Sequence, residues 1–339
     1  MKVIYLWAGL HLIILYSVNI SQEVNFNFYE NAKYIKTITF SEKILIGNIN
    51  FLDVNESVGI LVTDRIAGEV YLFEESGNFI NKVSPVLCYP GFNWRPIFSK
   101  FDKKGNILVI NGGPWGFRFD SSGNCIGPMD ISFLPPVHLD FLSNGQLVGY
   151  YNLDDGNQLK MMNSIGEKLF SFGNFPDEYK NLIYRLEGGG IVVDKHNNIY
   201  QVNVINPEIF KFNSEGQLIN SFAKFPTYFR HVEKDLKQNN PAQIMHELPI
   251  LLNHKTLVHG MFLYDEDILL LVFDNQKFFG LQFVNTSGEY LLNEELFIDR
   301  PVLSAKNGKI YLLNQPDLKN NFLPNPEIEV YEIMEINSK

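Results

Sequence analysis

The side chains that most often carry catalysis, His, Cys and Ser, are not arranged here in a recognisable catalytic or metal-binding pattern. The seven histidines fall in separate segments, so none has the spacing of a zinc site. The chain has no Gly-x-Ser-x-Gly turn, no phosphate-binding glycine loop and no Cys-x-x-Cys pair. We therefore predict no catalytic residue, no metal ligand and no cofactor, and we favour a role other than that of an enzyme.

Carboxylates and amides are the residues that could still hold a hard cation, because Ca²⁺ prefers oxygen ligands. The candidates follow predicted strands and are Asp64, Asp154, Asp155, Asn206, Asp274 and Asn275. The segments 154–156 and 274–275 are equally typical of hairpin turns. A cation-dependent enzyme is therefore the alternative and not the main interpretation.

Aromatic and arginine side chains are concentrated in loops between predicted strands. Three of these loops are long and cover residues 84–96, 175–185 and 225–255. Loops often carry binding residues, and Trp, Tyr and Arg dominate recognition surfaces. The candidate ligand-binding residues are Asp64, Arg65, Trp94, Arg95, Trp115 and Arg185. For each ring taken alone, the alternative is that it covers a hydrophobic core.

One turn motif recurs along the chain: an aromatic or apolar pair, polar residues, Gly, and then apolar residues. Its glycines are Gly77, Gly123, Gly166, Gly216 and Gly288. Each copy predicts a β-hairpin in which Gly takes a positive φ. Successive copies are 43 to 50 residues apart except for the last interval of 72, which we interpret as a blade carrying an inserted loop at about 225–255. The period is that of four-stranded propeller blades.

A second turn motif lies one strand earlier in each repeat, so that each repeat has four strands. Its copies are at 102–109, 143–148, 194–200 and 306–311, with looser versions at 53–61 and 264–270. Six repeats predict an all-β fold, a six-bladed β-propeller with four antiparallel strands per blade. Segment 34–40 alternates apolar and polar residues, and we expect this N-terminal strand to pair with the last blade and close the ring. A β-sandwich with similar turns is the alternative.

The composition indicates a globular chain and excludes nucleic-acid binding. Hydrophobic residues make up 45% of the chain and charged residues 19%, which supplies enough apolar surface for a folded core. The net charge of −10 and the lack of a basic stripe oppose binding to phosphate backbones.

The N-terminus has the pattern of a secretory signal. Lys2 is followed by an uncharged run at 3–22, whose most apolar part ends near Tyr16. This run is short for a membrane span, which needs about 20 strongly apolar residues. We expect residues 1–21 to be a cleaved signal peptide and 22–339 a single propeller domain, without a membrane span in the mature chain. An uncleaved anchor and a buried first strand are the alternatives.

Two cysteines, Cys88 and Cys125, are too few for a disulfide scaffold in a chain of this length. The repeats place them on different parts of a blade, so two buried thiols are expected. Export leaves a single bridge as the alternative.

Some repeats resemble a known blade signature. Residues 194–200 and 207–216 resemble NHL-type repeats, and 63–65 with 70–73 resemble another copy. Segment 173–179 is similar to the connector of exported bacterial six-bladed propellers with NHL/TolB-like folds. The resemblance covers nearly the whole mature chain and implies the fold, but little about activity, because that family is mostly of unassigned function. The lipidation Cys of many members is missing here, which favours a soluble periplasmic or extracellular protein.

We therefore predict a non-catalytic, monomeric propeller that binds an unknown glycan, peptide or protein outside the cytoplasm. The candidate residues should share one rim, near the mouth of the channel, because loops after second strands and loops between blades emerge on the same face. The Gly-turn hairpins should emerge on the other face. The alternative is a cation-dependent, lactonase-like hydrolase or lyase with its site in the central channel, where at least three carboxylate, amide or imidazole groups would have to meet.

Overall fold

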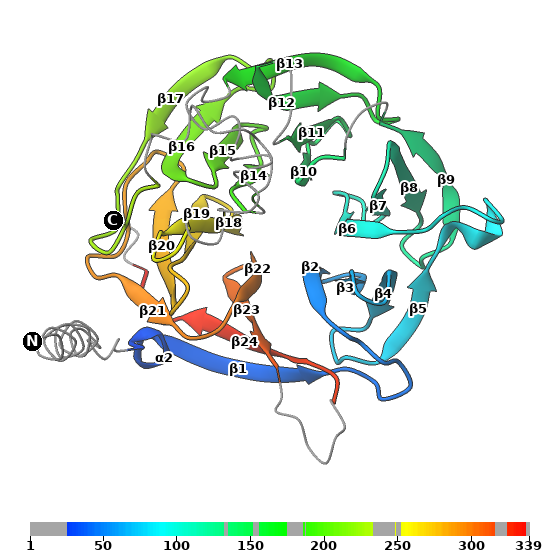
Figure 1. The fold of residues 1–339 in the computed structure, drawn as a ribbon, viewed down its shortest axis with the longest axis horizontal. Coiled ribbons are helices and arrows are strands. Elements are labelled where there is room, and N and C mark those ends of the chain that lie inside the picture. Colours follow the sequence, from blue (N-terminus) through cyan, green and yellow to red (C-terminus); the bar gives the residue numbers. More distant parts are fainter. Residues whose placement is uncertain are drawn as a thin grey trace, which may run out of the picture.

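The computed structural model describes residues 26–131, 135–151, 156–174, 186, 188–232, 248, 252–315 and 324–336. Within these residues, six four-stranded antiparallel sheets surround a common axis (Figure 1). The predicted all-β, six-bladed propeller with four strands per blade is confirmed.

In five blades the four strands follow one another along the chain, from the axis outwards. Blade 1 contains β2 (Ile49–Asn55), β3 (Gly59–Asp64), β4 (Glu69–Phe73) and β5 (Phe79–Val83), and blade 2 contains β6 (Pro96–Phe101), β7 (Ile107–Asn111), β8 (Trp115–Phe119) and β9 (Cys125–Asp130). Blade 3 contains β10 (His138–Phe141), β11 (Leu147–Tyr150), β12 (Asn157–Met162) and β13 (Lys168–Asn174). Blade 4 contains β14 (Gly190–Val193), β15 (Ile199–Asn203), β16 (Asn206–Phe212) and β17 (Leu218–Phe222), and blade 5 contains β18 (Leu257–Asp265), β19 (Ile268–Asp274), β20 (Phe279–Asn285) and β21 (Leu296–Ile298).

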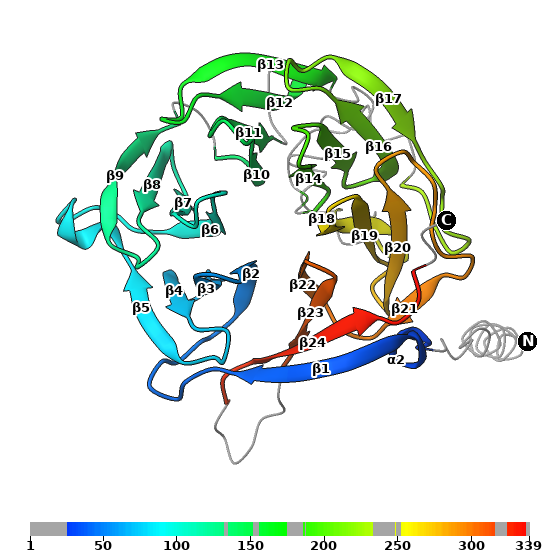
Figure 2. The same ribbon diagram turned by 180° about the vertical axis from the view of Figure 1, so that it is seen from behind.

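The sixth blade combines both ends of the domain. Its inner strands are β22 (Val302–Lys306), β23 (Lys309–Asn314) and β24 (Glu327–Ile333), and its outermost strand is β1 (Ala32–Thr39). The strands β1 and β24 lie side by side and antiparallel (Figure 2), with Ile38 opposite Ile328. The prediction that an N-terminal strand closes the ring is therefore confirmed.

A short helix before β1 extends this closure to blade 5. The helix α2 (Phe28–Asn31) buries Phe28 completely. Just before it, the Asn27 side chain donates to the carbonyl of Glu295 and accepts from the amide of Phe297, which lies in β21. The N-terminal segment thus connects the last two blades.

The hydrophobic cores lie between neighbouring blades. Leu61 and Leu72 of blade 1, for example, pack with Val109, Phe117 and Phe119 of blade 2, and all five are completely buried. A blade alone would expose these apolar side chains to water, so each blade depends on its neighbours for stability.

A Gly-turn hairpin can also pack closely against the side chains of the preceding blade. Gly216 joins β16 to β17 with a φ of +77°, and a Cβ at this position would lie 2.8 Å from the ring of Phe172 in the preceding blade. Glycine is required here both for the left-handed backbone and for the close approach.

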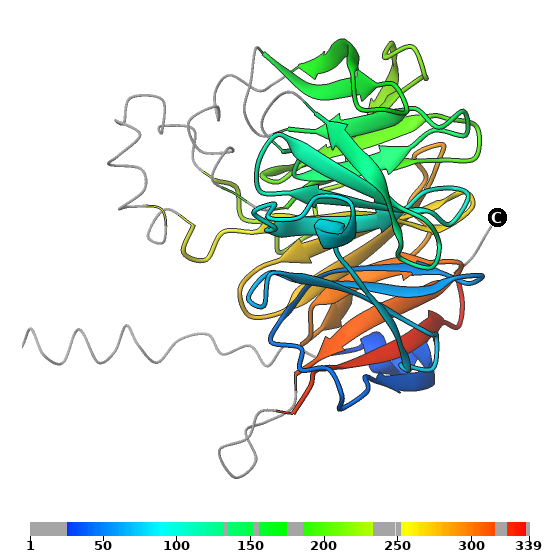
Figure 3. The same cartoon turned by 90° about the vertical axis from the view of Figure 1, so that its right-hand side faces the viewer.

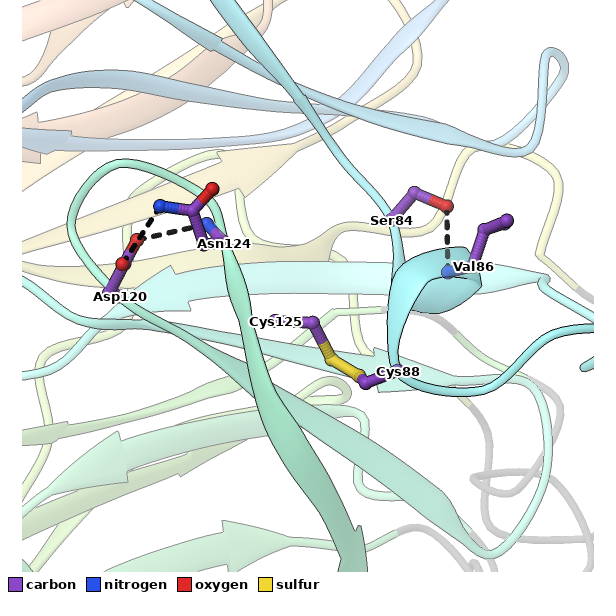
Figure 4. Close-up of a disulfide and its surroundings, with 6 residues drawn as sticks. All are labelled: Ser84, Val86, Cys88, Asp120, Asn124 and Cys125. Atoms are coloured by element: carbon purple, nitrogen blue, oxygen red, sulfur yellow. Dashed lines mark hydrogen bonds between the residues drawn. A yellow bond between two sulfur atoms is a disulfide. The ribbon is translucent and has the colours of Figure 1, made fainter.

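The structure corrects the expectation of two buried thiols: Cys88 and Cys125 form a disulfide (Figure 4). Cys88 follows the short 3₁₀-helix Pro85–Leu87 in the loop between blades 1 and 2, and Cys125 begins β9. The loop folds back on the outer strand of blade 2, which brings the two Cα atoms to 6.1 Å, within the range of disulfides. Repeat positions alone could not show this fold-back.

The propeller has two different ends (Figure 3). At the hairpin end lie the turns that follow the inner strands, such as β2–β3, together with the Gly-turn hairpins. At the crossing-loop end lie the loops after second strands and the connections between blades. The longest connection runs from Phe222 to Leu257, and its described parts project to the left in Figure 3.

Several predicted features fall on residues outside the described set. They are the signal peptide at 1–21, most of the inserted loop at 225–255 and most of the connector at 173–179. In the described part of the chain, no helix has the length and apolar character needed to cross a bilayer.

Candidate functional site

A cavity of 980 Å³ runs along the propeller axis and is lined by the inner strands of all six blades. Its lining extends from Asn48 and His259 at the crossing-loop end to Lys103 and Asn307 at the hairpin end. This volume is in the range of pockets that enclose small molecules. The two halves of the cavity have different chemistry.

At the hairpin end, ion pairs connect the inner strands of neighbouring blades. Nζ of Lys100 in β6 lies 2.9 Å from Oδ1 of Asp140 in β10. Nζ of Lys306 in β22 lies 3.6 Å from Oδ1 of Asp53 in β2. These ion pairs join blade 2 to blade 3 and blade 6 to blade 1.

The same two carboxylates also bind the backbone of the next blade. Oδ2 of Asp53 accepts the amide of Phe101 at 2.7 Å, and Oδ2 of Asp140 accepts the amide of Val193 at 2.8 Å. Both oxygens of each Asp are thus engaged by a lysine or by backbone N–H groups. These carboxylates hold blades together in this structure and are not arranged as open oxygen ligands.

The charges of this network reinforce one another. Burial acts to lower the pKa of Lys100, but the negative charges of Asp140 and Asp53 outweigh it and raise that pKa. Burial acts to raise the pKa of Asp140, but the charges of Lys100 and Lys103 and the hydrogen bonds from Lys100 and the Phe141 amide together outweigh it, so that the pKa is lowered. Both side chains therefore stay charged over the physiological pH range.

At the crossing-loop end, two histidines line the cavity from different blades. His138 is the first residue of β10, and His259 lies near the start of β18. Burial, followed by the charges of Lys100 and His259, lowers the pKa of His138 to about 4. Burial also lowers the pKa of His259, although Asp274 opposes the effect. Both imidazoles are therefore neutral at pH 7.

The position of His138 is fixed by its surroundings. Its ring lies 6.1 Å from the ring of Phe51 and 6.1 Å from that of Tyr150, and it hydrogen-bonds to the backbone of Gly188. Its Nε2 atom is buried and has no hydrogen-bond partner among the residues that the structure describes.

Three of the predicted site residues lie at the crossing-loop end of blade 2. The rings of Trp94 and Phe117 are 5.8 Å apart, and Trp94 packs onto the core between blades 1 and 2. Arg95 and Trp115 are exposed. The carbonyl of Arg95 accepts the amide of Gly112, so Arg95 lies next to the loop that leads to Trp115.

The other three predicted residues have different positions. The carboxylate of Asp64 is completely buried and accepts the amides of Gly47, Ile66 and Ala67, so it stabilises two loops. Arg65 is exposed at the crossing-loop end and lines the cavity. Arg185 lies outside the described residues.

The predicted oxygen ligands for a cation form turns where they are described. Oδ1 of Asn206 accepts the amide of Glu208, and Oδ1 of Asp274 accepts the amide of Gln276. Asp154 and Asp155 are not among the described residues. Within the described part of the chain, no three His, Cys, Asp or Glu side chains are close enough together to hold a metal ion.

The sequence contains a signal for the channel residues. Asp53, Lys100 and Asp140 occupy the same place in successive repeats, shortly before the turn that follows the inner strand. A charged residue in an otherwise apolar inner strand indicates a group that faces the channel or a partner in the next blade.

Comparison with known proteins shows similarity of fold only. No protein-family model matches the chain, and no curated protein matches its sequence. A Bacteroides fragilis protein, named as a candidate exported protein, has a similar structure with a TM-score of 0.64 and 12% identity, and the match covers 92% of this chain and 98% of that one.

Two further solved structures have the same architecture. A Bacteroides vulgatus member of the DUF4221 family matches with a TM-score of 0.62 and 10% identity over 89% of this chain and 97% of its own. Virginiamycin B lyase from Staphylococcus aureus matches with a TM-score of 0.51 and 13% identity over 92% and 99%. At such low identities the likeness establishes the propeller fold and leaves the activity open.

Proposed function

We propose that this protein is a non-catalytic propeller that acts outside the cytoplasm, as a monomer, and binds a glycan, peptide or protein at its crossing-loop end. The observation that carries this proposal is the position of exposed Trp115 and Arg95 at the same end of the ring as Arg65, which lines the cavity. Exposed Trp and Arg side chains beside a concave site are typical of binding surfaces.

The loop that carries Arg95 is held in place before any ligand arrives. The disulfide of Cys88 anchors its first part to β9, and the Arg95 amide bonds to the side chain of Asn111. A loop that is already ordered loses less conformational entropy on binding. This rigidity supports a recognition role for the surface formed by Arg95 and Trp115.

Three observations support a location outside the cytoplasm. The first residues have the pattern of a secretory signal. The Cys88–Cys125 disulfide is typical of oxidising compartments. One of the structurally similar proteins is itself named as a candidate exported protein.

The test is binding to glycan and peptide arrays by the purified protein and by the double variant Arg95→Ala/Trp115→Ala. We expect the double variant to lose the signals that the unaltered protein gives. A matched control is Lys104→Ala/Leu218→Ala, which removes one exposed cation and one exposed apolar side chain at the hairpin end. Equal loss in both variants would contradict the proposal.

A second candidate function is that of a hydrolase or lyase acting in the channel. It is favoured by the two neutral imidazoles of His138 and His259, because imidazole is the commonest general base. It is tested by incubating the protein with virginiamycin B, with and without added Ca²⁺ or Mg²⁺, and following the intact compound by liquid chromatography. Consumption of the compound that stops in His138→Gln would favour the enzyme over the binding protein.

A further inference from the structure

The charged residues of the cavity are divided unevenly along the axis. Lysines and carboxylates both line the hairpin half, where Lys100 is paired with Asp140 and Lys306 with Asp53. In the described part of the chain, Arg65 is the charged residue that lines the crossing-loop half. The two histidines of this half are neutral at pH 7, so a bound molecule meets the positive charge of Arg65 there.

The guanidinium of Arg65 lies where a molecule in the channel can reach it. Arg65 is exposed in the turn between β3 and β4 and forms part of the cavity wall. Its planar group of N–H donors fits both oxygens of a carboxylate, and a bond to another group still leaves donors for a ligand. The carboxylate of the neighbouring Asp64 is completely buried, bonds to three loop amides and is not part of the described wall.

A second donor lies beside Arg65 on the same wall. Asn50 is half-buried and lines the cavity, and its Oδ1 accepts the backbone amide of Arg65 at 3.1 Å. The remaining polar group of the Asn50 side chain is its NH₂ donor. Blade 1 therefore presents a cation and an amide donor next to each other, which is the arrangement that recognises a carboxylate.

The rest of this half is mainly apolar. Its walls include Phe51, Ile97, Val137 and Leu313, which come from four different blades and are all partly exposed. Pockets for small molecules are lined mostly by apolar and aromatic side chains, with a few polar groups that fix orientation. A molecule held by Arg65 would therefore place an apolar body against these walls.

We propose that the crossing-loop half of the channel binds an organic carboxylate with an apolar body, whose carboxylate pairs with the guanidinium of Arg65 and accepts a hydrogen bond from the NH₂ group of Asn50. This inference rests on the proposed function, since it names a class of ligand for the same end of the ring. Taking an anion out of water costs free energy unless the anion is paired, and the charge-assisted hydrogen bonds offset this cost. The carboxylate can belong to a free small acid or to the C-terminus of a peptide.

The test uses N-acetylphenylalanine and N-acetylphenylalaninamide as probes in ligand-observed NMR titrations of the unaltered protein. The two probes have the same apolar body, but only the first carries a carboxylate. We expect the acid to bind about 10-fold more tightly, as hydrogen bonds to a charged group would give. Added NaCl should weaken binding of the acid and leave that of the amide unchanged. Equal affinity of the two probes, or no binding of the acid, would overturn the proposal.

Variants locate the effect. Arg65→Gln should abolish the preference for the acid, whereas Arg65→Lys should keep part of it, because lysine retains the charge without the planar fork. The matched control is Arg230→Gln, since Arg230 is exposed in the Phe222–Leu257 connection at the same end and is not part of the described cavity wall. A preference that survives in Arg65→Gln, or that Arg230→Gln abolishes, would contradict the proposal. If Arg65→Gln fails to fold, the two probes and the salt dependence on the unaltered protein decide.

A second pair of probes identifies the source of the carboxylate. It consists of the peptide Gly-Gly-Gly-Phe and the same peptide with a C-terminal amide. If the free peptide acid binds more tightly than N-acetylphenylalanine, the site takes a chain end that also contacts the rim. If it binds no more tightly, the site takes a free small acid. Both results support the carboxylate class, and a peptide amide that binds as tightly as the peptide acid contradicts it.

The outcome can be separated from that of the proposed function. The array experiment depends on Arg95 and Trp115 on the rim, whereas the probe preference depends on Arg65. If the array signals need the rim but the acid is not preferred over the amide, the binding function stands and the carboxylate site is wrong. If the acid is preferred and needs Arg65 while the array signals do not need the rim, the carboxylate site stands and the rim surface is wrong.

Discussion

At the hairpin end of the channel, Lys100 and Asp140 pair across two blades at 2.9 Å, whereas at the crossing-loop end Nε2 of His138 is buried without a partner among the described residues. Both ends are built from the same six inner strands, so the fold does not dictate this difference. At one end the buried polar groups are used to connect blades. At the other, the two histidines are neutral at pH 7, and aromatic rings pack against His138.

The difference extends to how each end is held together. Ion pairs and Asp-to-backbone bonds join the blades at the hairpin end. The loop between blades 1 and 2 is fixed differently, by a covalent bond from Cys88 to Cys125, the first residue after the Gly turn of blade 2. The ion pairs and the disulfide should therefore respond to different chemical treatments, and the following predictions are arranged from the largest expected effect to the smallest.

The largest effect is expected from breaking the disulfide. The bridged cysteines are 37 residues apart, and cross-linking a loop of this length stabilises a folded chain by about 4 kcal/mol in the chain-entropy model. The variant Cys88→Ser/Cys125→Ser should lose about this much free energy of unfolding in urea titrations. A reductant should lower the midpoint of the unaltered protein and leave that of the variant unchanged. No change in either case would show that the loop is held by its packing alone.

The next effect concerns the ion pairs of the hairpin end. Asp140→Ala leaves Lys100 without its nearest counter-charge in a site that is mostly buried, which should cost about 3 kcal/mol of unfolding free energy. The double variant Lys100→Met/Asp140→Ala removes both charges and should recover part of the loss. Urea unfolding of the three proteins measures this, and a double variant less stable than Asp140→Ala would contradict the assignment.

The third effect is the dependence of stability on pH, which comes from a histidine at the crossing-loop end. The pKa of His138 is about 4 in the folded protein, well below its usual value of 6.5, so the unfolded chain binds this proton more tightly. Above pH 6.5 the titration of His138 does not reduce the free energy of unfolding. As the pH falls from 6.5 towards 4, protonation of the unfolded chain lowers this free energy. Lowering the pH from 7.5 to 5 should cost about 2 kcal/mol through this residue.

The measurement is urea unfolding at both pH values for the unaltered protein and for His138→Gln. The variant should show a smaller loss of stability on acidification, because glutamine does not titrate. His259, whose pKa is also lowered by burial, adds an effect of the same sign that remains in the variant. If the two proteins lose stability equally, His138 does not bind its proton more weakly in the folded state.

The sequence predicted the fold because propeller blades repeat. Each blade needs the same turns at the same places, so residues such as Gly216 recur with a recognisable period. The closing strand could be predicted as well. A closed ring needs a strand to pair with the last blade, and segment 34–40 near the N-terminus alternates apolar and polar residues as a β-strand does. Both features depend on local sequence.

The features that the sequence did not reveal depend on contacts between blades. Cys88 meets Cys125 only because a loop folds back on the next blade. Asp53 and Asp140 recur at the same place in their repeats, but the residues that they bind lie in neighbouring blades. Asp64 was predicted as a binding residue because of its place after a strand, but its buried carboxylate accepts three loop amides. Pairings of this kind need three-dimensional positions.

The smallest effect on stability is expected at the rim, where the crossing-loop end meets solvent. Arg95 is exposed, so Arg95→Ala should change the free energy of unfolding by less than about 0.5 kcal/mol. The exposed fraction of Trp115 is 36%, so Trp115→Ala should cost more than Arg95→Ala but less than Trp94→Ala. Trp94→Ala is the matched contrast, because this indole packs against Phe117 and Phe119 and its loss should be clearly destabilising. Urea unfolding of the three variants measures the difference. Small losses would leave both side chains available for recognition, whereas a large loss of stability in Trp115→Ala would assign that ring to the packing of blade 2.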